Sequence, residues 1–211
     1  MFWRPRYRIY RRVYRRQRII ERKSPIVFNH GQTVEILGRA FDIQAIETVS
    51  DRSKVRLKGS TVAIALPAGL TEREKKRHVS YLTRRVIAKA LLPDVDKRVR
   101  ELNDMHFKSE INKVRLKDTA TMWASCSIHN NINLDFRLLF APEHIRDAII
   151  IHELAHTIKR DHSKAFWGLV NGIVPDYKER RRWLKENASK LKPTIVAQPM
   201  AVTDTNKYVQ S

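Results

Sequence analysis

Four residues whose side chains could bind or use a metal ion lie close together in the segment "IIIHELAHTIKRDHSK": His152, Glu153, His156 and His162. His152 and His156 are four residues apart, so on a helix both imidazoles project from one face, one turn apart. Two such nitrogens can bind one Zn²⁺, and a glutamate beside the first histidine can act as general base on a metal-bound water. The spacing therefore predicts a zinc site with His152 and His156 as ligands and Glu153 as the catalytic residue.

A catalytic zinc needs a third protein ligand if one position is to stay open for water. We expect that ligand to be His162, because Asp161 before it favours a turn that can bring the chain back toward the metal. Cys126 is the alternative third ligand, since a thiolate binds zinc well. A buried cysteine on a strand is the other interpretation of Cys126. The structural alternative for the whole segment is a helix face whose histidines make ordinary hydrogen bonds.

The elements that must position these residues begin with strands. Short β-branched runs in residues 34–67 predict two to four strands. Thr71 and Glu74 form a capping box that predicts a helix over residues 71–92. Pro93 is expected to end that helix and to begin a second one over residues 93–107.

The second half of the chain predicts further strands and then helices. "KVRLKD" is typical of a strand, and "TMWASCS" with "NINLDFRLLF" predicts strand, turn and strand, with Ile132, Leu134 and Phe136 on one face. Pro142 is expected to open the central helix, which runs to about Lys159. Ser163 should cap the next helix, residues 164–173, and "DYKERRRWLKEN" the last one. The order of elements predicts an α+β fold.

Composition divides the chain into three parts. We expect a basic, aromatic arm over residues 1–24, one domain over residues 25–190 and a flexible tail over residues 191–211. The formal net charge is +20, and residues 1–23 contribute +9 of it. Such charge favours binding to polyanions.

The arm also carries aromatic residues at helical spacing, Trp3, Tyr7, Tyr10 and Tyr14. A helix with this stripe could contact RNA, a ribosome or an anionic membrane. A plain solubilising tail and an organellar transit peptide are the other interpretations.

The remaining composition concerns the compartment of the protein. The chain has one cysteine, which excludes an internal disulfide framework and fits a reducing compartment. No apolar run is long enough to predict a transmembrane segment, and the start lacks the apolar core of a secretory signal. We therefore expect a cytoplasmic protein, and its oligomeric state is left open.

Two segments together resemble a known family. "IIIHELAHTIKRDHSKAFWGLVNGIVPDYKERRRWLKEN" and "TMWASCSIHNNINLDFRLLFAPEHIRDAIIIHELAH" are similar to the YgjP-like (WLM) metallopeptidases, relatives of the SprT-like proteases among the zincins. The resemblance extends over about residues 34–187, without the arm. Ala124 stands where that family usually has glycine, which would matter if the position needs positive φ.

The resemblance implies a zincin-like minimal metalloprotease domain, with a small N-terminal sheet packed on helices and the HExxH helix central. It places the metal ligands on His152, His156 and His162 and the catalytic glutamate on Glu153. The expected function is a zinc metallopeptidase that hydrolyses peptide bonds of a protein or peptide substrate by a Glu-activated, metal-bound water. The alternative is a nucleic-acid-associated basic protein with a structural or vestigial zinc site.

Several other residues are candidates for supporting roles. His129 and Asn131 could border a substrate cleft, because a strand edge can pair with an extended peptide. Tyr177 and Arg180 could donate a hydrogen bond to an oxyanion. We expect three aromatic side chains to pack under the site: Phe166, Trp167 and Trp183.

Overall fold

The computed structural model describes residues 26–119 and 122–196. The chain forms two compact units, which we describe separately: one contains Ala88–Lys192, the other Val27–Ile87 and the residues from Pro193 onward. The expected basic arm and residues 197–211 lie outside the described residues. The domain boundaries expected from composition stay a prediction. Among the described helices, none is both long and apolar enough to cross a membrane.

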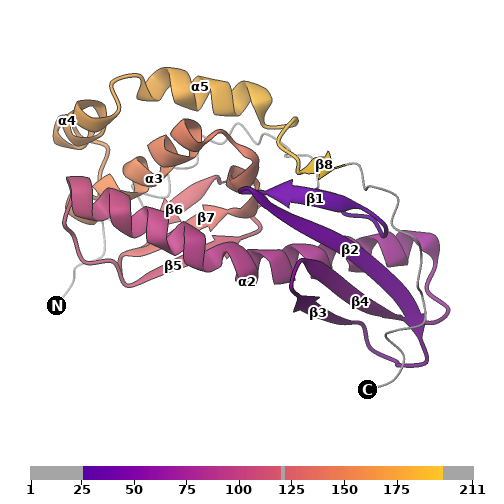
Figure 1. Ribbon diagram of the computed structural model, residues 1–211. Coiled ribbons are helices and arrows are strands. Elements are labelled where there is room, and N and C mark those ends of the chain that lie inside the picture. Colours follow the sequence, from indigo (N-terminus) through magenta and orange to yellow (C-terminus); the bar gives the residue numbers. More distant parts are fainter. Residues whose placement is uncertain (1–25, 120–121, 197–211) are drawn as a thin grey trace, which may run out of the picture. The chain divides into compact units, whose positions relative to one another are not determined.

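A five-stranded sheet dominates the unit formed by Val27–Ile87 and the chain after Pro193 (Figure 1). Its order is β3-β4-β2-β1-β8, and only the β2–β4 pair is parallel. The strands are β1 (Thr33–Ile36), β2 (Arg39–Thr48), β3 (Lys54–Lys58), β4 (Thr61–Pro67) and β8 (Thr194–Val196). Four strands within the first half confirm the prediction for residues 34–67. Strand β8 lies in the segment expected to be a flexible tail, and it pairs with β1 at one edge of the sheet.

Helix α2 (Glu72–His106) starts in this unit and ends in the other. The predicted capping box is confirmed, because Glu74 N donates to Thr71 Oγ1 at 3.3 Å and Thr71 N donates to Glu74 Oε2 at 2.9 Å. The predicted break at Pro93 is wrong, since the helix continues through it. Leu91 and Val95 are buried on either side of Pro93, which is itself exposed. Lys89, whose carbonyl loses its helical donor because residue 93 is proline, is also exposed, and packing of the apolar face holds the helix together.

The unit containing Ala88–Lys192 has a three-stranded sheet with the order β5-β7-β6. The strands are β5 (Lys113–Lys117), β6 (Ala124–Cys126) and β7 (Asn131–Asp135), which is central and buried along its whole length. The expectation that the last strand continues to Phe140 is wrong, because residues Phe136–Phe140 form a 3₁₀ helix, η1. The side chain of Asp135 accepts a hydrogen bond from Arg137 N at 2.9 Å, which caps η1 and ends the strand. Ala124 has no positive φ, so alanine fits there.

Three helices complete this unit: α3 (Glu143–Ile158), α4 (Lys164–Ile173) and α5 (Tyr177–Asn187). Helix α3 contacts α4, α5, β6 and β7 and is therefore central to the unit (Figure 1). Its residues Ala148, Ile150 and Leu154 are fully buried. The predicted α+β class, with a small N-terminal sheet and the HExxH helix central, is confirmed.

Candidate metal centre

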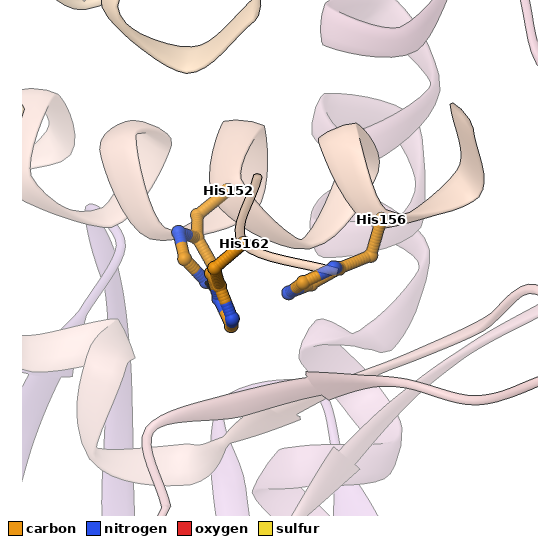
Figure 2. Close-up of side chains that lie close together, drawn as sticks. All are labelled: His152, His156 and His162. Carbon is orange, nitrogen blue, oxygen red and sulfur yellow. Dashed lines mark hydrogen bonds between the residues drawn. The ribbon is translucent and has the colours of Figure 1, made fainter. Parts of the chain in front are cut away.

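Helix α3 carries His152 and His156 on one face, as their spacing predicts. Figure 2 shows both side chains and His162 pointing into the same space beside the helix. The candidate ligand atoms of the three histidines all lie within 4.8 Å of one another. No other such group of histidine, cysteine or carboxylate side chains occurs in the part of the chain that the structure describes.

The end of α3 brings His162 to the other two histidines. Lys159 has extended backbone angles, φ −129° and ψ 116°, so the helix stops there and the chain turns. Asp161 Oδ1 then accepts a hydrogen bond from Ser163 N at 3.3 Å. Ser163 caps α4, as predicted, because its hydroxyl accepts from Phe166 N at 3.4 Å. His162 is thus held between the end of one helix and the cap of the next.

The distances and the donor atoms fit a zinc ion. In a tetrahedral site with Zn–N bonds of about 2.0–2.1 Å, two ligand nitrogens lie about 3.3–3.4 Å apart. His152 Nε2 and His162 Nε2 are 3.3 Å apart. His156 Nδ1 lies 3.1 Å from the carbonyl oxygen of Lys159, to which it can donate a proton. That tautomer leaves a lone pair on Nε2, the nitrogen free to bind a metal.

The three imidazoles rest on one aromatic side chain. The ring of Phe166 is fully buried, and its centroid lies 4.5 to 5.0 Å from those of His152, His156 and His162. Trp167 stacks against His162 at 5.6 Å. The expectation that Phe166 and Trp167 pack under the site is confirmed, whereas Trp183 is only half-buried and has no ring contact with the histidines among the described residues.

Burial keeps the histidines neutral. It lowers the pKa of His156 to about 4, with a further contribution from His162, and it lowers the pKa of His152 still more. Burial also lowers the pKa of His162, and nearby Arg181 adds to this shift. Near pH 7 all three imidazoles are therefore in the form that binds a cation without first releasing a proton.

Glu153 follows His152 on the buried side of α3, where only 7% of its surface is exposed. Burial raises the pKa of its carboxyl group to about 8, and a hydrogen bond from the backbone of Cys126 offsets part of that rise. A carboxyl group with a pKa near neutrality can both accept and release a proton at the working pH. The Cys126 contact links Glu153 to strand β6, at the edge of the three-stranded sheet.

Cys126 is outside the metal-binding group that His152, His156 and His162 form. Burial raises the pKa of its thiol, which favours the neutral form. Its sulfur lies 3.5 Å from Arg160 Nη1. The same guanidinium donates to the carbonyl of Ser127 at 2.7 Å and to the side chain of Asn130. Arg160 therefore joins the loop between His156 and His162 to the turn after β6, a contact that the spacing of residues did not reveal.

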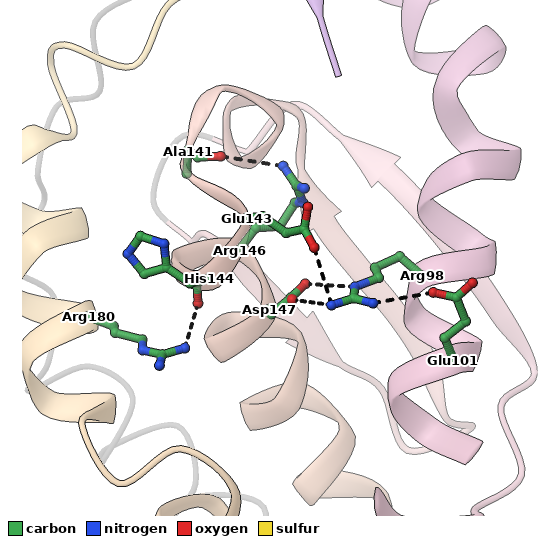
Figure 3. Close-up of polar contacts among 8 residues, drawn as sticks. All are labelled: Arg98, Glu101, Ala141, Glu143, His144, Arg146, Asp147 and Arg180. Atoms are coloured by element: carbon green, nitrogen blue, oxygen red, sulfur yellow. Dashed lines mark hydrogen bonds and ion pairs between the residues drawn. The ribbon is translucent and has the colours of Figure 1, made fainter. Parts of the chain in front are cut away.

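A network of arginine contacts holds α3 in place (Figure 3). Arg98 of α2 donates to Asp147 through Nη2 at 2.6 Å and Nε at 3.2 Å, a bidentate pair. Arg180 of α5 donates to Asp176 at 2.8 Å and to the carbonyl of His144 at 3.0 Å. These contacts occupy the Arg180 side chain, so they indicate a structural role for a residue that the sequence suggested as an oxyanion donor.

The other candidates lie in different surroundings. Tyr177 is buried, and its ring stacks on His152 with a centroid distance of 5.3 Å and an interplanar angle of 9°. Burial raises the pKa of its phenol above the usual range, so the hydroxyl keeps its proton. His129 is exposed in the turn after β6. Asn131 is buried in β7 and donates to Ser127 Oγ at 2.9 Å.

Comparison with known proteins shows the family of the chain. The family model of the YgjP-like metallopeptidase domain matches residues 6–187. The match begins inside the basic arm, so the expectation that the arm lies outside the family pattern is wrong for most of it. The chain is also similar to the crystal structure of the metallopeptidase zymogen of Pyrococcus abyssi abylysin, at 28% identity over 45% of this chain and 96% of that one, with a TM-score of 0.41. Among curated proteins, no sequence matches. With more than four-fifths of its length matched, the chain belongs to the YgjP-like metallopeptidase domain family.

Proposed function

We propose that this protein is a zinc-dependent peptidase in which His152, His156 and His162 hold the cation and Glu153 is the general base. The family consists of metallopeptidases, which implies a divalent metal. The observation that carries the proposal is the convergence of the three imidazoles within 4.8 Å. Nitrogen ligands and the 3.3 Å separation of two of them support zinc over a hard cation that prefers oxygen.

In the proposed hydrolysis, different side chains transfer the proton and contact the oxyanion. When bound, the cation supplies a Lewis acid that activates water and polarises a peptide carbonyl. The carboxylate of Glu153 accepts a proton from the attacking water, and the resulting carboxyl group donates it to the leaving amine. Tyr177, which stays protonated beside His152, is our candidate donor to the oxyanion.

Strand β6 is the element we propose to bind the substrate backbone. It is an edge strand and it contacts α3. An extended peptide can pair with such an edge and lie across the histidines. Exposed apolar side chains flank the strand at Met122 and Ile128, which offers contact area for side chains of a substrate.

The first test is the metal content per chain after purification without a metal-affinity tag. We expect close to one zinc in the wild type and loss or weaker retention in His162→Ala. His129→Ala is the matched control, because His129 is an exposed histidine outside the cluster. Full retention in His162→Ala would reject His162 as a ligand, and absence of metal in zinc-supplied wild type would reject the site.

The second test is hydrolysis of a mixture of unrelated peptides. We expect Glu153→Gln to keep the metal and to lose turnover by about 100-fold or more, because general-base catalysis contributes about that much. Glu186→Gln, a change at an exposed carboxyl group of α5, should leave turnover intact. Unchanged turnover in Glu153→Gln would reject the mechanism.

The alternative is a nucleic-acid-associated protein with a structural or vestigial zinc site, favoured by the net charge of +20. In that case the metal would stabilise the fold, and Glu153→Gln would change no measurable activity.

A further inference from the structure

Arg181 lies one helical turn after Tyr177, the tyrosine that stacks on His152. Tyr177 stacks on His152, and Arg181 follows it by four residues on the same face of α5. Side chains four residues apart on a helix have Cβ atoms about 5–6 Å apart. Helix α5 also contacts α3 (Figure 1). Arg181 therefore lies one helical turn from the residue that stacks on His152, and its side chain is exposed.

The other arginines of this region already have partners. Arg160 donates to the turn after β6, and Arg180 donates to Asp176 and to the carbonyl of His144. Arg181 forms no salt bridge or hydrogen bond with any residue that the structure describes. Of the three arginines, Arg181 is therefore the one whose guanidinium is available to bind an anion.

The charge of Arg181 does not help to hold a cation. A positive charge near the histidine cluster repels a metal ion that the cluster would bind. The favourable partner of this guanidinium is therefore an anion, and a carboxylate matches its planar pair of N–H donors.

We propose that Arg181 binds a carboxylate of the peptide substrate beside the bond to be cut, so that the site selects peptides with a carboxylate at that position. The inference rests on the proposed peptidase function. The carboxylate can belong to an aspartate or glutamate side chain, or to the C-terminus of the substrate. The first source makes the protein an acid-selective endopeptidase, and the second a carboxypeptidase.

Binding to the zinc-supplied Glu153→Gln protein tests the inference without turnover. The probes are three fluorescent peptides of one sequence: one with an internal glutamate and an amidated C-terminus, one with glutamine in its place and an amidated C-terminus, and one with glutamine and a free C-terminus. We expect one of the two carboxylate peptides to bind about tenfold to a hundredfold more tightly than the neutral peptide. Which one does so identifies the source of the carboxylate.

Arg181→Gln should abolish that preference, and Arg182→Gln is the matched control. Arg182 is also exposed on α5 and carries the same charge, but it lies about 100° further round the helix. An equal loss in both variants would assign the preference to general charge and overturn the inference. Equal binding of all three peptides would overturn it as well.

Cleavage of the same peptides by the protein with Glu153 separates the two proposals. Cleavage with a preference that Arg181→Gln does not change would overturn the role of Arg181 and leave the peptidase in place. Binding that depends on Arg181, without any cleavage, would overturn the peptidase and leave a carboxylate-binding site. Neither binding nor cleavage would overturn both.

Discussion

The buried carboxyl group of Glu153 makes the stability of the metal-free protein depend on pH. Its pKa is about 8 in the fold and near 4.5 in the unfolded chain. Between these values the folded form keeps a proton that the unfolded form releases. The contribution of Glu153 to stability is therefore complete below pH 4.5 and is lost as pH rises toward 8, by up to about 1.4 kcal/mol per pH unit.

We expect Glu153→Gln to remove this dependence. Urea unfolding of chelator-treated wild type and variant at pH 5, 6, 7 and 8 measures it, and the free energy of the wild type should fall relative to the variant as pH rises. The buried histidines act in the opposite direction, since their lowered pKa values cost stability as pH falls, but they are present in both proteins and cancel. Parallel curves for the two proteins would contradict the raised pKa.

Tyr177 allows the hydroxyl to be tested apart from the ring. Tyr177→Phe keeps the ring that stacks on His152 and removes only the oxygen. If the hydroxyl donates to the oxyanion, kcat falls by about 10²–10³-fold, the size of effect measured for other oxyanion donors, while KM and zinc affinity change little. Loss of zinc in Tyr177→Phe, or an unchanged kcat, would leave Tyr177 as packing for His152.

The residues of the cluster could be predicted from the sequence because their chemistry is local. His152 and His156 share a helix, and His162 follows six residues after His156, beyond a turn that Asp161 favours. Arg98 and Asp147 are far apart in sequence, and Arg160 contacts a turn formed by residues about 30 positions earlier. Such pairs depend on how elements pack, which hydrophobic periodicity and capping signals do not specify.

At the scale of elements, local capping signals predicted where two of the helices begin. Thr71 with Glu74 and Ser163 mark helix starts through hydrogen bonds within a few residues, and both occur as expected. The sequence does not predict the 3₁₀ helix after β7, because "NINLDFRLLF" continues the apolar pattern of the strand although Asp135 caps the turn. The intrinsic preference of Pro93 predicts a break in the helix, but packing of the long α2 outweighs that preference.

Helix α2 should therefore become more stable when Pro93 is replaced. A proline inside a helix is about 3 kcal/mol less favourable than alanine. Its restriction of the unfolded chain offsets up to about 1 kcal/mol of that. We expect Pro93→Ala to raise the free energy of unfolding by about 2 kcal/mol, measured by urea unfolding followed by helical circular dichroism.

Pro93→Gly is the control for this prediction. It restores the backbone N–H but lacks the helix preference of alanine, so its gain should be smaller by about 1 kcal/mol. Destabilisation by Pro93→Ala would mean that a kink at Pro93 is needed to pack the residues around Leu91 and Val95.

At the scale of the whole molecule, charge is distributed unevenly along the chain. Residues 1–23 contribute +9 of the net +20, and the family match includes most of them. Composition alone therefore cannot separate a role of the arm in the peptidase from binding to a polyanion. The two roles differ in how they respond to salt.

We expect binding of the full chain to a polynucleotide to weaken steeply with salt, because each neutralised phosphate adds about 0.9 to the slope of log K against log salt concentration on duplex DNA. Deletion of residues 1–23 should lower that slope by several units. Deletion of residues 197–211, which contain one lysine and one aspartate and so carry no net charge, is the matched control and should leave the slope unchanged. If deletion of residues 1–23 left the slope unchanged, the polyanion contact would lie in the rest of the chain, which carries a net charge of +11. Failure to bind at low salt would remove the nucleic-acid alternative and leave the arm to the peptidase.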